Sequence, residues 1–183
     1  LLLNRSLHRT FNNSSFNQGG RFYGGWWQNI PSRYRKSVTI NWIPTVELDY
    51  SSMQPRMLYA QEGLPFDGDA YAIEGIDRKY RKLIKKTLFK LINATGNMKA
   101  PRIAERPDGW EWKQILEALR EKHAPIEKYF NSGIGIKLQK VDAEIAEEVM
   151  LKFMERDILV LPVHDCQRRS KILPLGGAKV GHF

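Results

Sequence analysis

Asp49 and Asp165 are the two residues whose type and position first suggest chemistry. Each ends an apolar, strand-like run, residues 46–49 in one case and 158–165 in the other. Carboxylates at two strand ends can share a pair of divalent cations, which activate a primer hydroxyl and stabilise the departing pyrophosphate. The sequence therefore predicts half of a two-metal nucleotidyl-transfer site at each aspartate. The alternative is that each is an ordinary turn acid, because the two residues are far apart in the chain.

The segment 77–93 is the clearest predicted helix, with Asp77 placed to cap its start and Gly96 just beyond its end. At about 100° per residue, one face of this helix is apolar and should face a core. That face consists of Tyr80, Leu83, Ile84, Leu88 and Leu91. The opposite face is basic but includes an aromatic ring, and it consists of Arg78, Arg81, Lys82, Lys85, Lys86, Phe89 and Asn93.

A basic face with an aromatic ring suits a nucleoside triphosphate, because cations bind the phosphates and a ring stacks on the base or sugar. Arg81, Lys85 and Phe89 follow one another at four-residue intervals and so form a single stripe. The alternative is a solvated basic face on which Phe89 meets another lobe. Spacing alone leaves both interpretations open.

Composition and charge favour a nucleic-acid partner without identifying it. The chain has 183 residues, enough for one domain with a core or for a core with a small lobe, and too few for two full domains. Lys and Arg number 29 against 20 Asp and Glu, which gives a net charge of +9 and suits a polyanion. No acidic residue precedes Glu47, so the first quarter is uniformly basic.

The single cysteine, Cys166, excludes an intrachain disulfide and a thiolate zinc site, which indicates a reducing compartment. No apolar stretch approaches the roughly 20 residues of a membrane span, and residues 1–3 are too short for a signal sequence. We therefore expect a soluble, cytoplasmic protein without a membrane partner. The absence of an initial methionine indicates a fragment or a trimmed chain.

Around these residues the pattern predicts a mixture of short strands and helices. Residues 4–36 read as loop and short strands rather than helix, with Trp26 and Trp27 as packing residues. Strands are predicted at 37–42 and 45–50 on either side of Pro44, and at 158–163 and 168–173, which a tight connection at 165–167 joins as a hairpin. Further helices are predicted at 53–62, 110–122, 125–130 and 139–156.

Taken together, four segments resemble family A DNA polymerases, the bacterial DNA polymerase I type, and occur in the same order. The first is 20–22 with 28–31, which resembles the segment whose arginine touches the minor groove of the primer-template. The second is Asp49-Tyr50-Ser51 with Arg56, and the third is the Arg81, Lys85 and Phe89 stripe. The fourth is Val163-His164-Asp165, and the similarity covers about residues 19–165.

The resemblance implies an α+β fold, a polymerase palm with an antiparallel sheet and packed helices, plus a small helical fingers lobe. The palm would comprise about 19–62 and 134–183, and the fingers about 63–133. It implies a DNA polymerase that extends a primer in DNA replication, with Asp49 and Asp165 holding two Mg²⁺ ions, or Mn²⁺ in their place. Implied nucleotide-binding residues are Arg81, Lys85, Phe89, Gln54, Arg56 and Asn93, with Lys85 also a proton donor to pyrophosphate. Implied contacts to primer-template are Arg21, Gln28, Gln139 and His164.

The sequence also departs from that family. Gln54 replaces the glutamate that excludes ribonucleotides, so the resemblance leaves the choice of sugar open. Asn93 stands in place of a tyrosine, Cys166 in place of a glutamate and Pro162 in place of a glutamine. The fingers are short, and no thumb or exonuclease precedes Arg21, which leaves room for a partner that supplies a thumb.

Two other functions fit the same residues. A non-catalytic, nucleic-acid-binding remnant of a polymerase would explain the substituted positions, although two carboxylates facing a polyanion would not help a pure binder. A phage-type single-subunit RNA polymerase shares the palm and both aspartates, and a phage or viral origin stays open. Metal-dependent binding of a nucleoside triphosphate separates the first from an enzyme, and extension with deoxyribonucleotides or ribonucleotides separates the second.

Overall fold

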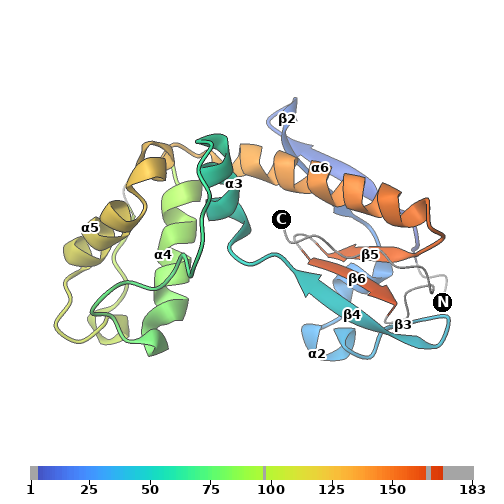
Figure 1. Ribbon diagram of the computed structural model, residues 1–183, viewed down its shortest axis with the longest axis horizontal. Coiled ribbons are helices and arrows are strands. Elements are labelled where there is room, and N and C mark those ends of the chain that lie inside the picture. The colour runs from blue at the N-terminus through green and yellow to red at the C-terminus, as the bar shows by residue number, and fades with distance from the viewer. Residues whose placement is uncertain (1–3, 97, 164–165, 171–183) are drawn as a thin grey trace. The chain divides into compact units, whose positions relative to one another are not determined.

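The computed structural model describes residues 4–96, 98–163 and 166–170 (Figure 1). It is a mixed α and β structure with small antiparallel sheets and several helices, which is compatible with the predicted α+β class. The chain forms two compact units. The first comprises Leu1–Phe11, Gly20–Tyr50 and Val141–Phe183, and the second comprises Asn12–Gly19 and Ser51–Lys140. The helix α3, which the sequence assigned to the palm, lies in the second unit.

The first unit is built on a four-stranded antiparallel sheet with the order β3-β4-β6-β5. Its strands are β3 (Thr39–Ile40), β4 (Ile43–Asp49), β5 (Val160–Val163) and β6 (Cys166–Ser170). β4 lies between β3 and β6, and its last residue, Asp49, pairs with Cys166. Segments from the beginning and the end of the chain therefore lie side by side in one sheet.

The interruption between β3 and β4 lies at Asn41 and Trp42, so the prediction that Pro44 breaks this strand was wrong. Both turn residues have positive φ, 50° and 65°, as a two-residue turn that matches strand twist requires. In such a hairpin the pair beside the turn is hydrogen-bonded and the next pair is not. Pro44 occupies that next position opposite Thr39, where its missing N–H is not needed.

Two short helices, α1 (Trp26–Asn29) and α2 (Ser32–Arg35), lie in the region predicted to lack helix. α1 is explained by Trp27, whose buried ring packs with Val38, Leu161 and Val163. The indole Nε1 also donates to the carbonyl oxygen of Pro162 at 2.9 Å. The prediction that Trp27 is a packing residue is confirmed, and tertiary burial has overridden the weak local helix signal.

A two-stranded hairpin of β1 (His8–Asn12) and β2 (Ser15–Tyr23) precedes these helices. In the first unit, Arg9 of β1 contacts Glu147 at 2.9 Å. Glu147 belongs to α6 (Gly135–Met154), a helix of 20 residues. No helix in the described part of the chain is both long enough and apolar enough to cross a membrane.

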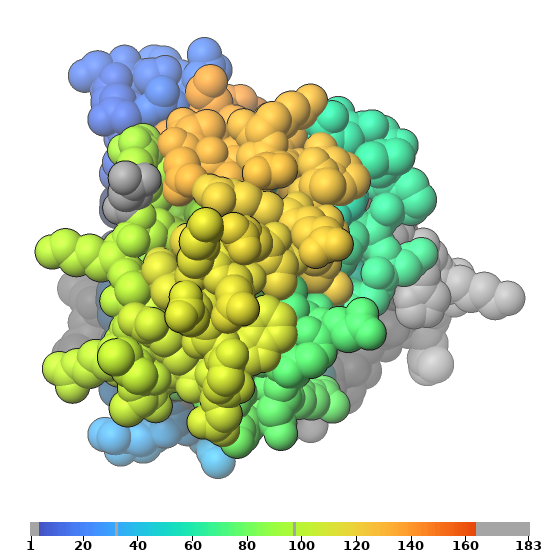
Figure 2. Space-filling view, turned by 90° about the vertical axis from the view of Figure 1, so that its left-hand side faces the viewer, coloured from blue at the N-terminus to red at the C-terminus, as the bar shows by residue number. Residues whose placement is uncertain are grey.

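The second unit is mainly helical. Its helices are α3 (Met53–Gln61), η1 (Arg78–Tyr80), α4 (Arg81–Asn93), η2 (Ile103–Glu105), α5 (Trp112–Lys122) and η3 (Ala124–Tyr129). It also includes the hairpin segment Asn12–Gly19 and the start of α6. Figure 2 faces this unit, with the yellow side chains of α5 in front. The fully buried apolar residues of the unit include Leu58, Ile84, Leu88, Leu91, Ile92, Ile115, Leu119, Ile126 and Leu138. Burial of Ile84, Leu88 and Leu91 confirms the predicted apolar face of the 77–93 helix.

His123 is the buried polar centre of this unit. Its Nε2 lies 2.9 Å from the carbonyl oxygen of Ala70, and its Nδ1 lies 3.2 Å from the hydroxyl of Tyr59. Because a carbonyl only accepts, the ring proton sits on Nε2 and Nδ1 accepts from Tyr59. Burial lowers the pKa of His123 below its ordinary value, so the neutral ring is the folded form.

Stability is therefore expected to fall as the pH drops below about 6.5, the ordinary pKa of histidine. Below that pH the unfolded chain takes up a proton that the folded chain does not, which costs at most about 1.4 kcal/mol per pH unit. Thermal melting of wild type and His123→Gln between about pH 7.5 and 5.5 measures the effect. The His123→Gln variant should have a flatter profile than wild type, and His8→Gln, at an exposed position, is the control variant. Equal slopes for His123→Gln and wild type would contradict the assignment.

Candidate functional site

Asp49 is an exposed carboxylate at the end of β4. Its side chain makes no hydrogen bond or ion pair with any residue that the structure describes. Its strand partner Cys166 directly follows Asp165 in the sequence, whereas Asp165 and His164 themselves lie outside the described residues. Within the described ranges, no three His, Cys, Asp or Glu side chains are grouped to hold a metal ion. Asp49 thus has free oxygens of the kind that Mg²⁺ binds.

The predicted basic face lies on α4 and on the 3₁₀ turn η1 before it. The carboxylate of Asp77 accepts a hydrogen bond from the backbone N–H of Lys79 at 2.7 Å, so the predicted cap is confirmed. Lys85 is exposed, and Phe89 keeps 56% of its surface in solvent although it lies in the middle of a helix. The division of this helix into an apolar and a basic face is confirmed, and nucleotide binding by the basic face stays a prediction.

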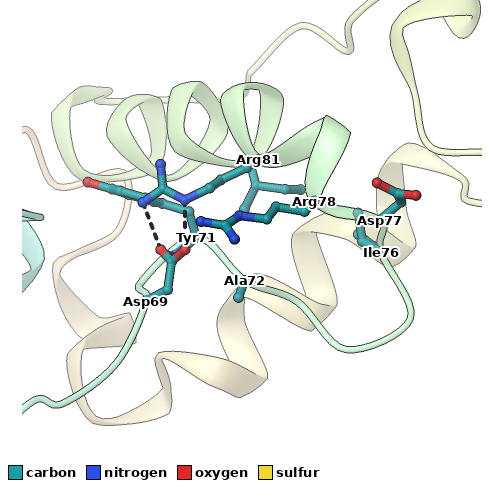
Figure 3. Close-up of a pocket in the computed structure, with 8 residues that line it drawn as sticks. Asp69, Tyr71, Ala72, Ile76, Asp77, Arg78 and Arg81 are labelled. Carbon is teal, nitrogen blue, oxygen red and sulfur yellow. Dashed lines mark hydrogen bonds and ion pairs between the residues drawn. The ribbon is translucent and has the colours of Figure 1, made fainter.

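Arg81 is held by an ion pair that the sequence did not predict. Its Nε and Nη2 contact the two carboxylate oxygens of Asp69 at 2.6 Å and 3.0 Å (Figure 3). The guanidinium carbon also lies 4.9 Å from the ring centroid of Tyr71, and the Nζ of Lys85 lies 5.7 Å from the same centroid. The hydrogen bond from Arg81 is the largest influence that lowers the pKa of Asp69, so its carboxylate stays charged.

A cavity of about 370 Å³ opens beside this ion pair. Its lining combines apolar and charged side chains, namely Asp69, Tyr71, Ala72, Ile76, Asp77, Arg78, Arg81 and Ile84 (Figure 3). The cations come from η1 and α4, and the carboxylates come from the loop before them. A phosphate group would find two guanidinium groups on this wall, both of which bind oxyanions through a planar fork.

Gln54 and Asn93 contact each other through their amides. The Asn93 Nδ2 donates to the Gln54 Oε1 at 2.9 Å, and the reverse contact from Gln54 Nε2 is longer, 3.5 Å. Asn93 Nδ2 also donates to the carbonyl oxygen of Phe89 at 2.7 Å. A Cβ at Gly135 would overlap the Asn93 side chain, so only glycine lets α6 begin this close to it. Gln54 and Asn93, at both of which the sequence departs from the resembled family, thus contact each other.

Arg56 has structural contacts of its own. Its Nε donates to the carbonyl oxygen of Ser51 at 3.0 Å, and its Nη1 donates to that of Phe66 at 2.9 Å. These bonds hold the segments on both sides of α3. A role for Arg56 beside the sugar stays a prediction.

Two of the residues expected to contact nucleic acid, Arg21 and Gln28, are engaged within the first unit. The Nε and Nη2 of Arg21 donate to one carboxylate oxygen of Asp142, a residue of α6 that is buried. The Gln28 side chain donates to the carbonyl oxygens of Phe22 and Pro162, both at 3.0 Å. Gln139, in the α6 segment assigned to the second unit, is half-buried.

Sequence reasoning missed Asp69 and Tyr71, the two residues that fix Arg81. Both lie in a loop without helical or strand periodicity, twelve and ten positions before the arginine. An acidic residue before a basic helix does not indicate which of the arginines it will contact. The path of the folded loop determines that Asp69 pairs with Arg81.

The first unit presents an exposed carboxylate, Asp49, at a strand end, and the second unit presents a basic, partly aromatic helix face on α4. No protein-family model matches the chain, and neither a curated protein nor a solved structure shows significant similarity to it.

Proposed function

We propose that this chain is a template-directed nucleotidyltransferase that extends a primer with nucleoside triphosphates, most simply a DNA polymerase. The observation that carries the proposal is the register between β4 and β6, in which Asp49 lies opposite Cys166. The residue directly before Cys166 in the sequence is joined to this strand partner of Asp49 by a peptide bond. That residue is Asp165, the second carboxylate a shared metal site requires.

The residues fit the chemistry of nucleotidyl transfer. Asp49 and Asp165 would bind two Mg²⁺ ions, and carboxylate oxygens are the ligands this hard cation prefers. When bound, Mg²⁺ supplies activation of the primer hydroxyl and charge stabilisation at the leaving group. Arg81 and Lys85 would neutralise the triphosphate, and Lys85 would give a proton to the departing pyrophosphate. Phe89, exposed on the same stripe, would stack on the nucleotide.

Primer extension by the purified chain with Mg²⁺ tests the proposal. We expect incorporation that follows the template base and stops when the metal is chelated. A nucleic-acid-binding remnant would instead bind primer-template equally with and without Mg²⁺, and its affinity would fall steeply with salt. Binding of primer-template without extension would therefore contradict the proposed enzyme and favour the non-catalytic remnant.

The contact between Gln54 and Asn93 makes the choice of sugar testable. Gln54→Glu keeps the acceptor for the 2.9 Å bond from Asn93 and loses only the donor of the 3.5 Å contact. We expect this variant to fold, and to discriminate more strongly against ribonucleotides by about 10-fold, because it restores the glutamate by which the resembled family excludes them. Single-nucleotide extension with matched deoxyribo- and ribonucleotides measures the ratio of kcat/KM. An unchanged ratio would remove Gln54 from the sugar side.

A further inference from the structure

The ion pair between Arg81 and Asp69 has no role in the function proposed above. A carboxylate and a phosphate use the same planar fork of an arginine, so Asp69 occupies donors that a triphosphate could use. The two oxygens of Asp69 take Nε and Nη2. The remaining guanidinium nitrogen, Nη1, has no hydrogen-bond partner among the residues that the structure describes. It points to the side opposite Asp69 (Figure 3). One edge of Arg81 is therefore used, and another is left for a ligand.

Asp69 is itself held in place by the backbone. The N–H of Tyr71 donates to Asp69 Oδ1 at 3.0 Å, so the carboxylate is oriented before any ligand binds. The Tyr71 ring is buried, and it supports the guanidinium of Arg81 from a distance of 4.9 Å. An arginine is otherwise a flexible side chain that loses rotamer freedom when it binds. The loop 69–71 removes part of that freedom in advance.

We infer that Asp69 is a positioning residue, which holds Arg81 by its Nε and Nη2 edge so that the remaining donors meet the triphosphate of the incoming nucleotide. This inference rests on the proposed function. It assigns a role to an acidic residue in a basic site, where simple charge counting would expect an acid to weaken binding. Ordering is the larger effect, because about one third of each side chain in the ion pair is exposed and the repulsion between Asp69 and a triphosphate is screened by water and salt.

Asp77 provides a matched control. It lines the same cavity and carries the same charge, but its carboxylate caps the backbone at Lys79 and has no bond to Arg81. Removing the charge of Asp77 therefore reports the loss of repulsion alone. Removing the charge of Asp69 reports that loss together with the release of Arg81.

The experiment measures the dissociation constant of a nucleoside triphosphate with Mg²⁺ for the full chain and four variants, Asp69→Asn, Arg81→Ala, the double variant and Asp77→Asn. We expect Asp69→Asn to bind about 3- to 10-fold more weakly, the cost of ordering one flexible side chain. Asp77→Asn should stay within about 2-fold, or bind more tightly. In the Arg81→Ala background, Asp69→Asn should no longer weaken binding, because Asp69 acts through Arg81.

The outcomes separate the inference from the proposed function. Unchanged or tighter binding by Asp69→Asn, with weaker binding by Arg81→Ala, overturns the role of Asp69 and leaves the proposed function standing. Equal weakening by Asp69→Asn with and without Arg81 also overturns it. Absence of triphosphate binding by the wild-type chain overturns both. Thermal melting checks that each variant folds, and Asp69→Ser is the second neutral variant if Asp69→Asn does not.

Discussion

Replacing Asp49 by asparagine is expected to reduce primer extension by about 10³-fold or more, because metal ions contribute several kcal/mol to the transition state and 1.4 kcal/mol corresponds to tenfold in rate. The change preserves the shape of the side chain and removes its charge. Asp49 is exposed at the end of β4, so folding should not depend on it. Single-turnover extension of a labelled primer with saturating Mg²⁺ and nucleotide measures the rate of the chemical step.

Glu47 supplies the control for Asp49. It is exposed on the same strand, and side chains two positions apart point to the same face. Glu47→Gln should keep the rate within about 2-fold, which excludes a general effect of negative charge on this strand. Asp165→Asn should lose as much activity as Asp49→Asn. Activity within tenfold of wild type for either aspartate variant would contradict the two-metal mechanism.

Replacing Lys85 by alanine is expected to lower kcat/KM for the nucleoside triphosphate by about 10²- to 10³-fold, because it removes a phosphate-binding cation and a proton donor together. Lys85 is exposed on α4, and its ammonium group makes a cation–π contact with the Tyr71 ring but no hydrogen bond or ion pair with a described residue, so the loss should not arise from unfolding. Steady-state extension at varied nucleotide concentration measures this ratio.

Lys86 is the matched control on the same helix. It is also exposed and carries the same charge, but it points about 100° away around the helix axis. Lys86→Ala should change kcat/KM by less than about 3-fold, the size of a general electrostatic effect. Equal losses for Lys85→Ala and Lys86→Ala would indicate a diffuse basic surface rather than a triphosphate site.

The fold was predictable where local pattern and burial agree. The helix ending at Asn93 shows both its cap at Asp77 and its apolar stripe in the sequence, because helical periodicity and capping are local properties. The start of α6 was placed four residues too late, since Gly133 and Gly135 disfavour helix locally. α1 was missed because burial of one residue, Trp27, holds a helix of a single turn.

For the candidate site too, some features could be predicted from the sequence and others could not. The types of Asp49, Arg81, Lys85 and Phe89 and their spacing are visible in the sequence, and so is their placement on a strand end and one helix stripe. The pairing of β4 with β6 is not visible, because strand register joins distant segments and no local rule selects the partner. The contact between Asp69 and Arg81 depends on the path of a loop, for which pattern gives no prediction.

Whether Asp49 and Asp165 bind the same cations is decided by a titration with Mn²⁺, in which the electron paramagnetic resonance signal of free Mn²⁺ is followed with triphosphate and primer-template present. We expect Asp49→Asn and Asp165→Asn each to abolish the tight binding of Mn²⁺ that wild type shows, and the double variant to lose no more than either single variant. Wild-type Mn²⁺ binding in either single variant, or losses that add as those of two independent sites, would contradict this expectation.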